Sequence, residues 1–445
     1  MLDLKKVKNL GQSMASKVAD KAAEVNAKAT RTAPADDQYV VGLDIGTEFV
    51  KALIGRVRAG GIEIIGVGRQ HQALSDMQAG AIADIGRVVE NCDKALAAAE
   101  QQAGVSARTA VLGIAGELVK GMTTTVRVTR KDAEKALDLP EVERIIKLVQ
   151  ERAQAKAKQQ LAWELGGKEV EIRLVNSALV GIEIDGYKVT SPVGFQGRDV
   201  VVQLYTAFAP LIHIGALERT AQQLDLDLLA VAAEPFAVSR SVIGDDTSAS
   251  MSAILMDIGG GTTDIAVIND GGVQGTKMFG IGGRAYTRAI ERELNIEFEQ
   301  AEDIKLDLHS SHLSQPKAAA AEGALNKTLD VWMSGVEVAL AEFTKLDHLP
   351  HHVLLCGGGS SLDMLMDKLE QTDWYTRLPF TRKPIVHHIH PEQVVGIVDK
   401  TGQVNDHTFI TAMGLLRVGL DTLQFSGSSQ TSGSMREKLD RMLRT

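Results

Sequence analysis

The sequence of 445 residues contains few cysteines, few prolines and no long apolar run. Its two cysteines, Cys92 and Cys356, provide neither a disulfide framework nor a metal-binding cluster, which suits a reducing cytoplasm. The count of 10 prolines argues against extensive disorder. No stretch of about 18 uninterrupted apolar residues is present, so we expect no transmembrane helix. The first residues mix apolar side chains with lysines, so we expect no signal peptide.

The net charge of −9 argues against a general nucleic-acid-binding protein. This charge is unevenly distributed, because residues 1–32 carry +4 and residues 435–445 carry +2, which leaves −15 for the rest of the chain. Basic ends on an acidic body indicate that the ends have a partner of their own. The length and an ordinary composition, 44% hydrophobic and 24% charged, predict a globular protein of two or more domains.

The pattern of strands and helices occurs twice along the chain, as two similar repeats. In the first, strand patterns begin at Tyr39, a helix follows at roughly 84–103, and an insert contains further strands and a charged helix at about 140–163. In the second, a strand hairpin at 253–268 is followed by helices, another strand and a final helix near 408–420. Strand hairpins followed by helices, occurring twice, predict two related α/β domains with a cleft between them.

Two segments share a pattern of strand, Asp-x-Gly, small residues and second strand: VGLDIGTEFVKALIG (41–55) and LMDIGGGTTDIAVI (255–268). Such a turn exposes backbone N–H groups and forms an anion-binding concavity, which phosphate oxygens can approach because side chains are missing. Asp44 and Asp257 end their strands, where carboxylates could hold a hydrated Mg²⁺ between them. Lys51, on the second strand, could meet a phosphate as a point charge.

A third glycine-rich segment, LLCGGGSSL (354–362), ends a strand and opens a helix. Its three glycines, 357 to 359, could admit a flat base and offer a helix N-terminus. One such segment alone would be interpreted as an ordinary glycine-rich turn. Two Asp-x-Gly hairpins and a glycine triplet in this order favour a nucleotide.

These motifs resemble those of the actin-like ATPase superfamily and, within it, the FtsA family of bacterial cell-division proteins, over roughly residues 39–420. The resemblance implies an α/β actin-like ATPase fold, with two related domains around a nucleotide cleft and with ATP and Mg²⁺ as cofactors. It also implies connecting helices at 233–238 and 408–416 and a ribose-closing stretch in GIGGRAYTRAI and AEDIK. The implied Mg²⁺ residues, acting through water, are Asp44 and Asp257. The implied cofactor-binding residues are Asp44, Gly46, Thr47, Glu48, Phe49, Lys51, Asp257, Gly259, Gly260, Gly261, Thr262, Thr263, Gly282, Gly283, Glu302, Lys305, Gly357, Gly358, Gly359 and Ser360.

Within the superfamily, the resemblance to FtsA rests on an insert. GIAGELVKGM, DGYKVTSPVGFQGRDV and LYTAFAP are similar to the start, middle and end of the FtsA subdomain 1C, although Ser191 replaces the common Asn before proline. The predicted division is a basic amphipathic extension and linker (1–38), domain 1A (39–118, 207–250 and 391–424), subdomain 1C (119–206), domain 2 (251–390, with 2B at roughly 284–350), a flexible linker (425–434) and an amphipathic membrane-targeting helix (435–445).

The predicted membrane-targeting helix, MREKLDRMLRT, has apolar residues on one stripe and basic residues that can meet anionic lipid. FtsA proteins are known to end in such a linker and helix. The residues predicted to meet the membrane are Met435, Leu439, Met442, Leu443, Arg436, Lys438 and Arg441. A partner-binding helix or a frayed end is the alternative.

The N-terminal extension departs from the FtsA pattern, which starts close to the first phosphate strand. Leu4, Val7, Met14, Val18 and Val25 form a thin helical stripe among lysines. A second, weaker membrane helix is our preferred interpretation. A helix that pairs with another protein and a disordered basic arm stay open.

Glu234 is the candidate catalytic residue, because relatives place a water-orienting Gln or Glu on this helix. The alternative is helix capping, with an acid before Pro235 at the first helical position. FtsA proteins need not hydrolyse ATP quickly, so we expect at most a slow ATPase. Histidines near 348–352 and 387–390 invite a metal interpretation, but a solvated edge is favoured since no acidic or cysteine partner has ligand spacing.

The resemblance implies a protein that polymerises at the inner face of the cytoplasmic membrane and tethers filaments of the division tubulin FtsZ there. Its expected partners are FtsZ, further copies of itself, an anionic membrane surface and other division proteins through the insert, with no nucleic acid. It would be cytoplasmic and peripheral to the membrane at the division site. The alternative is a scaffold of pilus assembly resembling PilM, which binds a partner peptide. A sugar-kinase relative is disfavoured, because no base for a substrate hydroxyl is evident.

Overall fold

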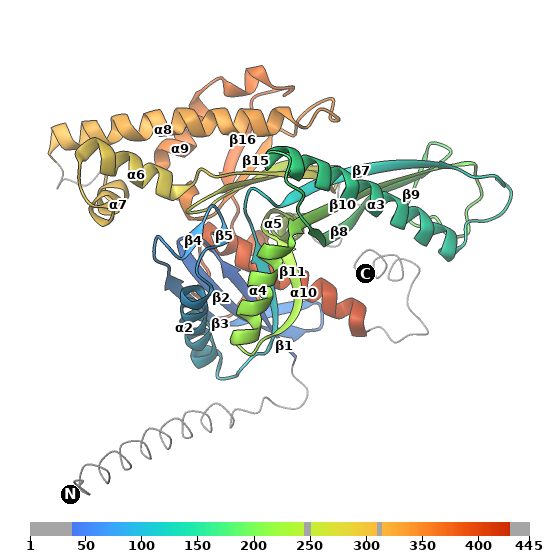
Figure 1. Ribbon diagram of the computed structural model, residues 1–445, viewed down its shortest axis with the longest axis horizontal. Helices are drawn as coiled ribbons and strands as arrows, with labels where there is room; N and C mark the ends of the chain where they lie inside the picture. The colour runs from blue at the N-terminus through green and yellow to red at the C-terminus, as the bar shows by residue number, and fades with distance from the viewer. Residues whose placement is uncertain (1–37, 244–250, 309–313, 428–445) are drawn as a thin grey trace, which may run out of the picture.

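The computed structural model describes residues 38–243, 251–308 and 314–427, and Figure 1 shows its elements. The strands form a six-stranded sheet, a nine-stranded sheet and a small ribbon of β4 (Met77–Gln78) and β5 (Ala81–Ile82). Among the helices of these residues, none combines the length and the apolar composition that a membrane span requires. The predicted N-terminal extension and the predicted membrane-targeting helix lie outside the described residues.

The six-stranded sheet has the strand order β11-β6-β1-β2-β3-β17. β1, β2 and β3 pair antiparallel, whereas β6, β11 and β17 join in parallel. The strand patterns predicted from Tyr39 onward are confirmed. The bounds are β1 (Tyr39–Ile45), β2 (Phe49–Arg58), β3 (Gly61–His71), β6 (Thr109–Ile114), β11 (Asp227–Ala233) and β17 (Ile397–Asp399).

The nine-stranded sheet has the order β16-β15-β12-β13-β14-β7-β10-β8-β9. Its first five strands repeat the arrangement of the other sheet, since β12, β13 and β14 pair antiparallel while β15 and β16 join in parallel. The two repeats predicted from the sequence are therefore confirmed. The bounds are β12 (Ala253–Ile258), β13 (Thr263–Asn269), β14 (Gly272–Phe279), β15 (His352–Cys356), β16 (Ile385–His388), β7 (Lys120–Thr129), β10 (Asp199–Pro210), β8 (Ile172–Ile184) and β9 (Tyr187–Val189).

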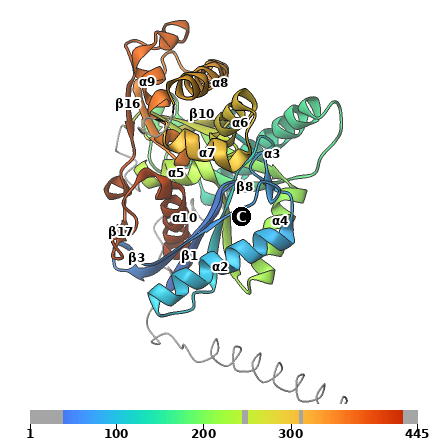
Figure 2. The ribbon, with the colours of Figure 1, turned by 90° about the vertical axis from the view of Figure 1, so that its left-hand side faces the viewer.

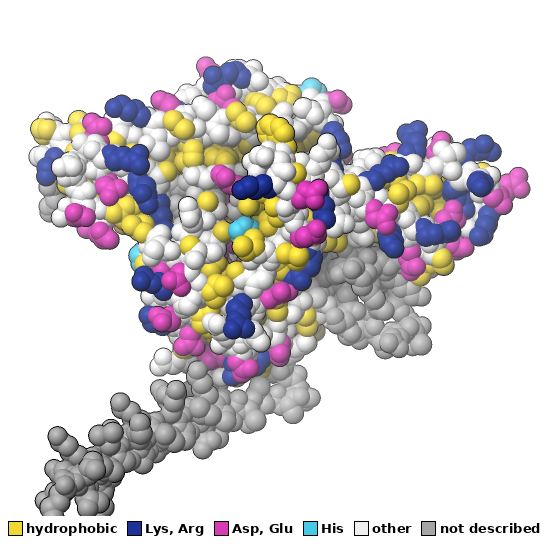
Figure 3. All heavy atoms as spheres, in the orientation of Figure 1, with side chains coloured by type: hydrophobic (Ala, Val, Ile, Leu, Met, Phe, Trp, Pro, Cys, Tyr) yellow, Lys and Arg dark blue, Asp and Glu magenta, His cyan; other side chains and the backbone are white. Residues whose placement is uncertain are grey.

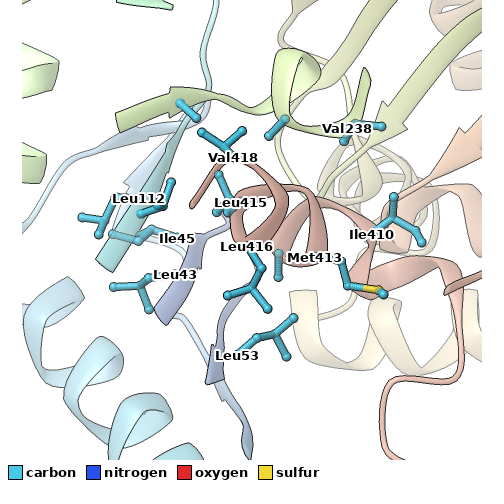
Figure 4. Packing of buried hydrophobic residues seen from close by; sticks show 14 of the residues in the cluster. Leu43, Ile45, Leu53, Leu112, Val238, Ile410, Met413, Leu415, Leu416 and Val418 are labelled. Atoms are coloured by element: carbon cyan, nitrogen blue, oxygen red, sulfur yellow. The ribbon is translucent and has the colours of Figure 1, made fainter. Parts of the chain in front are cut away.

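Two helices, α2 (Ile85–Ala103) and α10 (Ile410–Gly427), cover opposite faces of the six-stranded sheet (Figure 2). α10 contributes Leu415 and Leu416 to the large core, beside Leu53 of β2 (Figure 4). On the other face, α2 approaches β3 so closely that a Cβ atom on Gly68 would lie 1.8 Å from the Ala95 carbonyl oxygen. Glycine at this position is therefore required by the helix backbone.

The remaining helices surround the second sheet and join the two halves. A second core forms where α6, α8 and α9 cover β12, β13 and β15, with Trp332 fully buried in it. The charged helix predicted at about 140–163 is confirmed as α3. The bounds are α3 (Leu139–Glu164), α4 (Leu211–Gln223), α5 (Glu234–Ile243), α6 (Gly283–Leu294), α7 (Phe298–Leu306), α8 (Gln315–Ala341), α9 (Asp363–Gln371) and the short 3₁₀ helices η1 (Gly358–Ser361), η2 (Trp374–Arg377), η3 (Pro391–Gln393) and η4 (His407–Phe409).

The segment from β7 to β10 (Lys120–Pro210), called the β7–β10 region below, extends away from the rest of the molecule (Figure 1). It bonds to both halves. The Thr123 hydroxyl donates to the Val273 carbonyl oxygen of β14 at 2.6 Å, and the Asn176 side-chain oxygen accepts from the Ala233 N–H of β11 at 2.7 Å. The predicted boundary of the insert at 119–206 and the other domain boundaries stay predictions.

Candidate functional site

A cavity of about 760 Å³ opens between the two halves of the molecule. The β1–β2 turn and the β12–β13 turn both contribute to its wall, and the segment after β15 and the helices α6 and α7 complete it. Ligand sites commonly measure ~300–1,000 Å³, so a nucleotide-sized molecule fits. The cavity lies where the two repeats of the sequence predict a cleft.

Most of the predicted site residues line this cavity together. Elements far apart in the chain bring them there, since β1, β12, α7 and the segment after β15 all contribute. The predicted residues that line it are Asp44, Gly46, Thr47, Glu48, Phe49, Lys51, Glu234, Asp257, Gly259, Gly260, Thr262, Gly283, Glu302, Lys305, Gly357, Gly358 and Gly359.

Four predicted residues, Gly261, Thr263, Gly282 and Ser360, support the wall from behind. The Thr263 hydroxyl donates to the Ile281 carbonyl oxygen at 2.7 Å and accepts from the Trp332 indole N–H at 2.9 Å. The Ser360 hydroxyl donates to the Gly357 carbonyl oxygen at 2.7 Å. These hydroxyls are engaged with the protein.

Residues 259–261 are glycines partly because other protein atoms occupy the space that side chains would need. A Cβ atom on Gly260 would lie 2.9 Å from the Glu48 Cβ, and one on Gly261 would lie 2.8 Å from the Thr47 hydroxyl oxygen. The start of α6 approaches from another side, where the Gly283 N–H donates to the Gly259 carbonyl oxygen at 2.9 Å. The two phosphate-type turns are therefore in contact with each other.

Position 357 requires glycine for a different reason. Its φ of +82° lies in the left-handed region, and a Cβ atom there would lie 2.2 Å from Asp257 Oδ1. A side chain at this position would displace the Asp257 carboxylate. The third glycine segment and the second Asp-x-Gly turn are thus fitted to each other.

Buried acids dominate the electrostatics of the cavity. Burial raises the pKa of Asp257, and the Asp44 carboxylate adds to the increase although a hydrogen bond from Thr411 opposes it. Burial also raises the pKa of Asp264 well above its ordinary value, with Asp257 contributing. Since removing these carboxylates from water disfavours their charge, the cavity favours a cationic group or a proton.

Lys51 is the basic residue closest to these acids. Its ammonium donates to Asp44 Oδ2 at 3.0 Å. Burial works against the charged form, but attraction to Asp44, the hydrogen bond to it and attraction to Asp257 outweigh burial, and the pKa of Lys51 is raised. Lys51 therefore stays an ammonium within reach of an anion in the cavity.

Glu234 is the first residue of α5 and is buried in the cavity wall against Gly113. Burial raises its pKa well above the ordinary value, and repulsion from Asp44, Asp264 and Asp257 adds to the increase. Burial and the neighbouring acids therefore disfavour the charged form of this carboxyl.

The donor set fits a hydrated Mg²⁺ better than a directly bound metal ion. Among the described residues, no group of three histidine, cysteine or acidic side chains converges closely enough to hold a metal. The cavity nevertheless offers the carboxylate oxygens of Asp44, Asp257 and Asp264, and Asp264 Oδ1 is buried without a hydrogen-bond partner. Mg²⁺ retains several of its waters and prefers oxygen ligands, so Asp44 and Asp257 could reach it through water.

Several cavity residues were not predicted as site residues. Asp264 and Thr411 belong to quoted motifs, DIGGGTTD and TFITAMGLL, and could have been included. The Arg69 guanidinium lies 3.6 Å from the centre of the Phe49 ring, and Arg69 has no sequence signal. Tyr286 belongs to the quoted motif GIGGRAYTRAI and could also have been included. Arg284 follows the predicted Gly283 directly.

Histidine rings of the segments near 348–352 and 387–390 contact one another, and one pair is stacked. The rings of His388 and His407 lie 4.0 Å apart, and His407 Nε2 lies 3.0 Å from the Ser361 hydroxyl oxygen. Burial lowers the pKa of His407 to about 4, and His388 contributes to the decrease. His407 is therefore neutral near pH 7, and His388 packs beside the third glycine segment, where its Nε2 lies 3.0 Å from the Ser360 carbonyl oxygen.

Replacing Asp264 by Asn should stabilise the unliganded protein at pH 7 by roughly 1–3 kcal/mol, because the variant removes an unpaired buried charge. Its Thr262 hydrogen bond, 3.1 Å in the parent, can persist to the amide oxygen. A raised pKa in the folded state means that ionisation costs stability as pH increases. The gain of the variant over the parent should therefore shrink between pH 7 and pH 5. Thermal denaturation at both pH values measures it, and equal stability at pH 7 would contradict it.

Comparison with known proteins gives consistent matches. The profile of the family described as Cell division protein FtsA matches residues 254–414. The chain is 25% identical to the cell division protein FtsA of Pseudomonas aeruginosa over 418 residues, covering 89% of this chain and 93% of that protein. It is 25% identical to that of Bacillus subtilis over 283 residues, covering 63% of this chain and 60% of that protein.

Among solved structures, the chain is similar to the PilM–PilN type IV pilus biogenesis complex. The TM-score is 0.62 at 17% identity, with 86% of this chain and 98% of that chain covered. This likeness shows a shared fold. Together these matches confirm the resemblance that the motifs predict: the chain has an actin-like fold and is similar to the cell division protein FtsA.

Proposed function

We propose that this chain is an ATP-binding cell-division protein that polymerises at the inner face of the cytoplasmic membrane and tethers FtsZ filaments at the division site. The observation that carries the proposal is the cavity in which both Asp-x-Gly turns and the glycines 357–359 meet, in a chain similar to FtsA. The cytoplasmic, peripheral location follows from the same similarity.

In this proposal the triphosphate lies between the two turns and meets their backbone N–H groups. Lys51 offers a positive charge to a phosphate oxygen, and Asp44 and Asp257 hold the water shell of Mg²⁺, which offsets phosphate charge. Glu302 and Lys305, paired at 2.7 Å, face the ribose, and the glycines 357–359 leave room for the base. Glu234 is the candidate water-orienting residue, and the similarity to FtsA implies that hydrolysis is slow at most.

Membrane attachment is assigned to residues 435–445, which lie outside the described residues. The proposal rests on their sequence, with Met435, Leu439, Met442 and Leu443 at helical spacing and basic residues between them. Each basic residue near an anionic surface contributes about 1 kcal/mol, so attachment should weaken as salt increases.

The β7–β10 region is proposed to contact neighbouring subunits or other division proteins. Among the described residues, the Trp, Tyr and Phe side chains that are exposed all lie there: Trp163 at 81%, Tyr187 at 78% and Phe195 at 50%. Figure 3 shows charged side chains of both signs around an apolar patch on this region. Exposed aromatic residues are typical of protein interfaces.

Replacing Trp163, Tyr187 or Phe195 by Ser, one at a time, should reduce polymerisation or partner binding at least severalfold for at least one site. ATP affinity and melting temperature should stay within error of the parent, since these side chains are exposed. Sedimentation of the protein with ATP measures assembly. Normal assembly and normal partner recruitment in all three variants would contradict the proposed surface.

FtsZ capture tests the proposed function. The purified full chain, with and without ATP and Mg²⁺, is mixed with FtsZ and anionic liposomes, and the liposomes are floated. FtsZ should float only when this protein is present. Failure to capture FtsZ under any nucleotide condition would overturn the tethering function.

The alternative is a PilM-like scaffold that binds a partner peptide, and the likeness to the PilM–PilN complex is the observation that favours it. A lipid-binding tail is not ordinarily needed for that role. Liposome binding by the last 20 or so residues would favour the FtsA-like function, and its absence would favour the scaffold.

A further inference from the structure

Arg284, the second residue of α6, crosses the cavity to the opposite half. Its Nε donates to Glu48 Oε2 at 2.7 Å, and its Nη2 donates to the Thr47 carbonyl oxygen at 2.7 Å. Longer contacts, each 3.4 Å, reach the carbonyl oxygens of Gln72 and Leu74. One side chain of the second half therefore contacts the β1–β2 turn, the residue after β3 and the loop beyond it.

The backbone of Arg284 is attached to the other turn. Its N–H donates to the Gly260 carbonyl oxygen at 2.8 Å. A single residue thus links the β12–β13 turn, through its backbone, to the β1–β2 turn, through its side chain. In the proposed function these are the two turns between which the phosphates lie.

The Glu48 carboxylate lies in the cavity wall, and the Arg284 guanidinium offsets its negative charge. A carboxylate in a phosphate-facing turn would repel a phosphate, yet Glu48 lines the cavity. Both of its oxygens are engaged, Oε2 with Arg284 and Oε1 with His71 Nε2 at 2.7 Å. The Arg284 side chain is only 10% exposed, so removing Glu48 would leave a largely buried charge without its carboxylate.

We propose that Arg284 is a positioning residue of the nucleotide site. It acts through Glu48 and the Thr47 carbonyl to hold the two turns together, and it thereby determines how long a nucleoside triphosphate stays bound. This inference rests on the proposed ATP binding, and it assigns Glu48 to closure of the site instead of direct contact with phosphate.

The test measures dissociation of a fluorescent ATP analogue from the full chain, by stopped-flow chase with excess ATP and Mg²⁺. Arg284→Gln and Glu48→Gln should each raise the dissociation rate about tenfold or more. The double variant should dissociate no faster than the faster single variant, because both break the same pair. Arg284→Lys, which keeps the charge but loses the fork of donors, should give an intermediate rate.

Arg288→Gln is the matched control, since Arg288 lies on the same helix and is exposed. Its dissociation rate should equal that of the parent. Parent-like rates in folded Arg284 and Glu48 variants, or fully additive effects in the double variant, would overturn the inference alone. No binding of the analogue by the parent would overturn the proposed ATP binding and this inference with it.

Hydrogen–deuterium exchange without nucleotide provides a second measurement that a failed binding assay does not affect. Arg284→Gln should increase exchange in both turns, residues 46–51 and 259–263, relative to Arg288→Gln. Unchanged exchange in both turns would show that Arg284 does not hold them together, which overturns the inference.

Discussion

Asp257→Ala should weaken ATP binding by at least tenfold. Asp257 is buried beside Asp44 in the cavity, and in the proposed function it holds the water shell of Mg²⁺. Without it, phosphate charge is less well compensated, and a loss of about 1.4 kcal/mol already corresponds to tenfold. Titration calorimetry with ATP and Mg²⁺ measures the affinity.

Folding should not explain that loss. Asp257→Ala removes a carboxylate whose burial raises its pKa, which favours the fold, and leaves the Thr411 hydroxyl without its acceptor, which opposes it, so thermal denaturation should show a folded variant. Asp347→Ala, on an exposed loop, is the matched control and should bind ATP as the parent does. Unchanged affinity in a folded Asp257→Ala variant would remove Asp257 from the site.

Leu439→Glu with Leu443→Glu should release the protein from anionic liposomes while ATP binding persists. One short amphipathic helix gives weak, reversible attachment, because few apolar side chains reach the acyl chains. Assembly presents many such helices at once, so avidity multiplies the weak affinities. Two glutamates on the apolar stripe should therefore abolish sedimentation with liposomes even for assembled protein.

The N-terminal extension could mask this effect, so the variants should also be tested in a chain that starts at Asp36. Ser428→Glu with Ser432→Glu adds the same charge in the predicted linker and should leave attachment nearly intact. If the shortened double variant still sediments with anionic liposomes, the C-terminal anchor is wrong and the PilM-like scaffold gains support.

Local patterns predicted the elements of this fold well. The helix α2 and the β12–β13 hairpin match their predicted ranges within a residue or so, because periodicity and turn residues are local properties. The repetition of the two hairpins also indicated that Asp44 and Asp257 would meet in one cavity, and they do.

Local sequence patterns did not predict which side chains from distant segments contact each other. Glu48 and Arg284 are separated by 236 positions, and neither sequence context indicates a pair. Motif membership likewise does not show which side chains face inward. Thr263 and Ser360 belong to motifs, yet their hydroxyls bond within the wall, because strand alternation and the 3₁₀ turn direct them there.

The most direct test of the central claim is a crystal structure of the full chain with a non-hydrolysable ATP analogue and Mg²⁺. The triphosphate should lie between residues 46–51 and 259–263, with Mg²⁺ bridged through water to Asp44 and Asp257 and the base beside Gly357–Gly359. A nucleotide bound elsewhere, or a cavity that stays empty at saturating analogue, would contradict it.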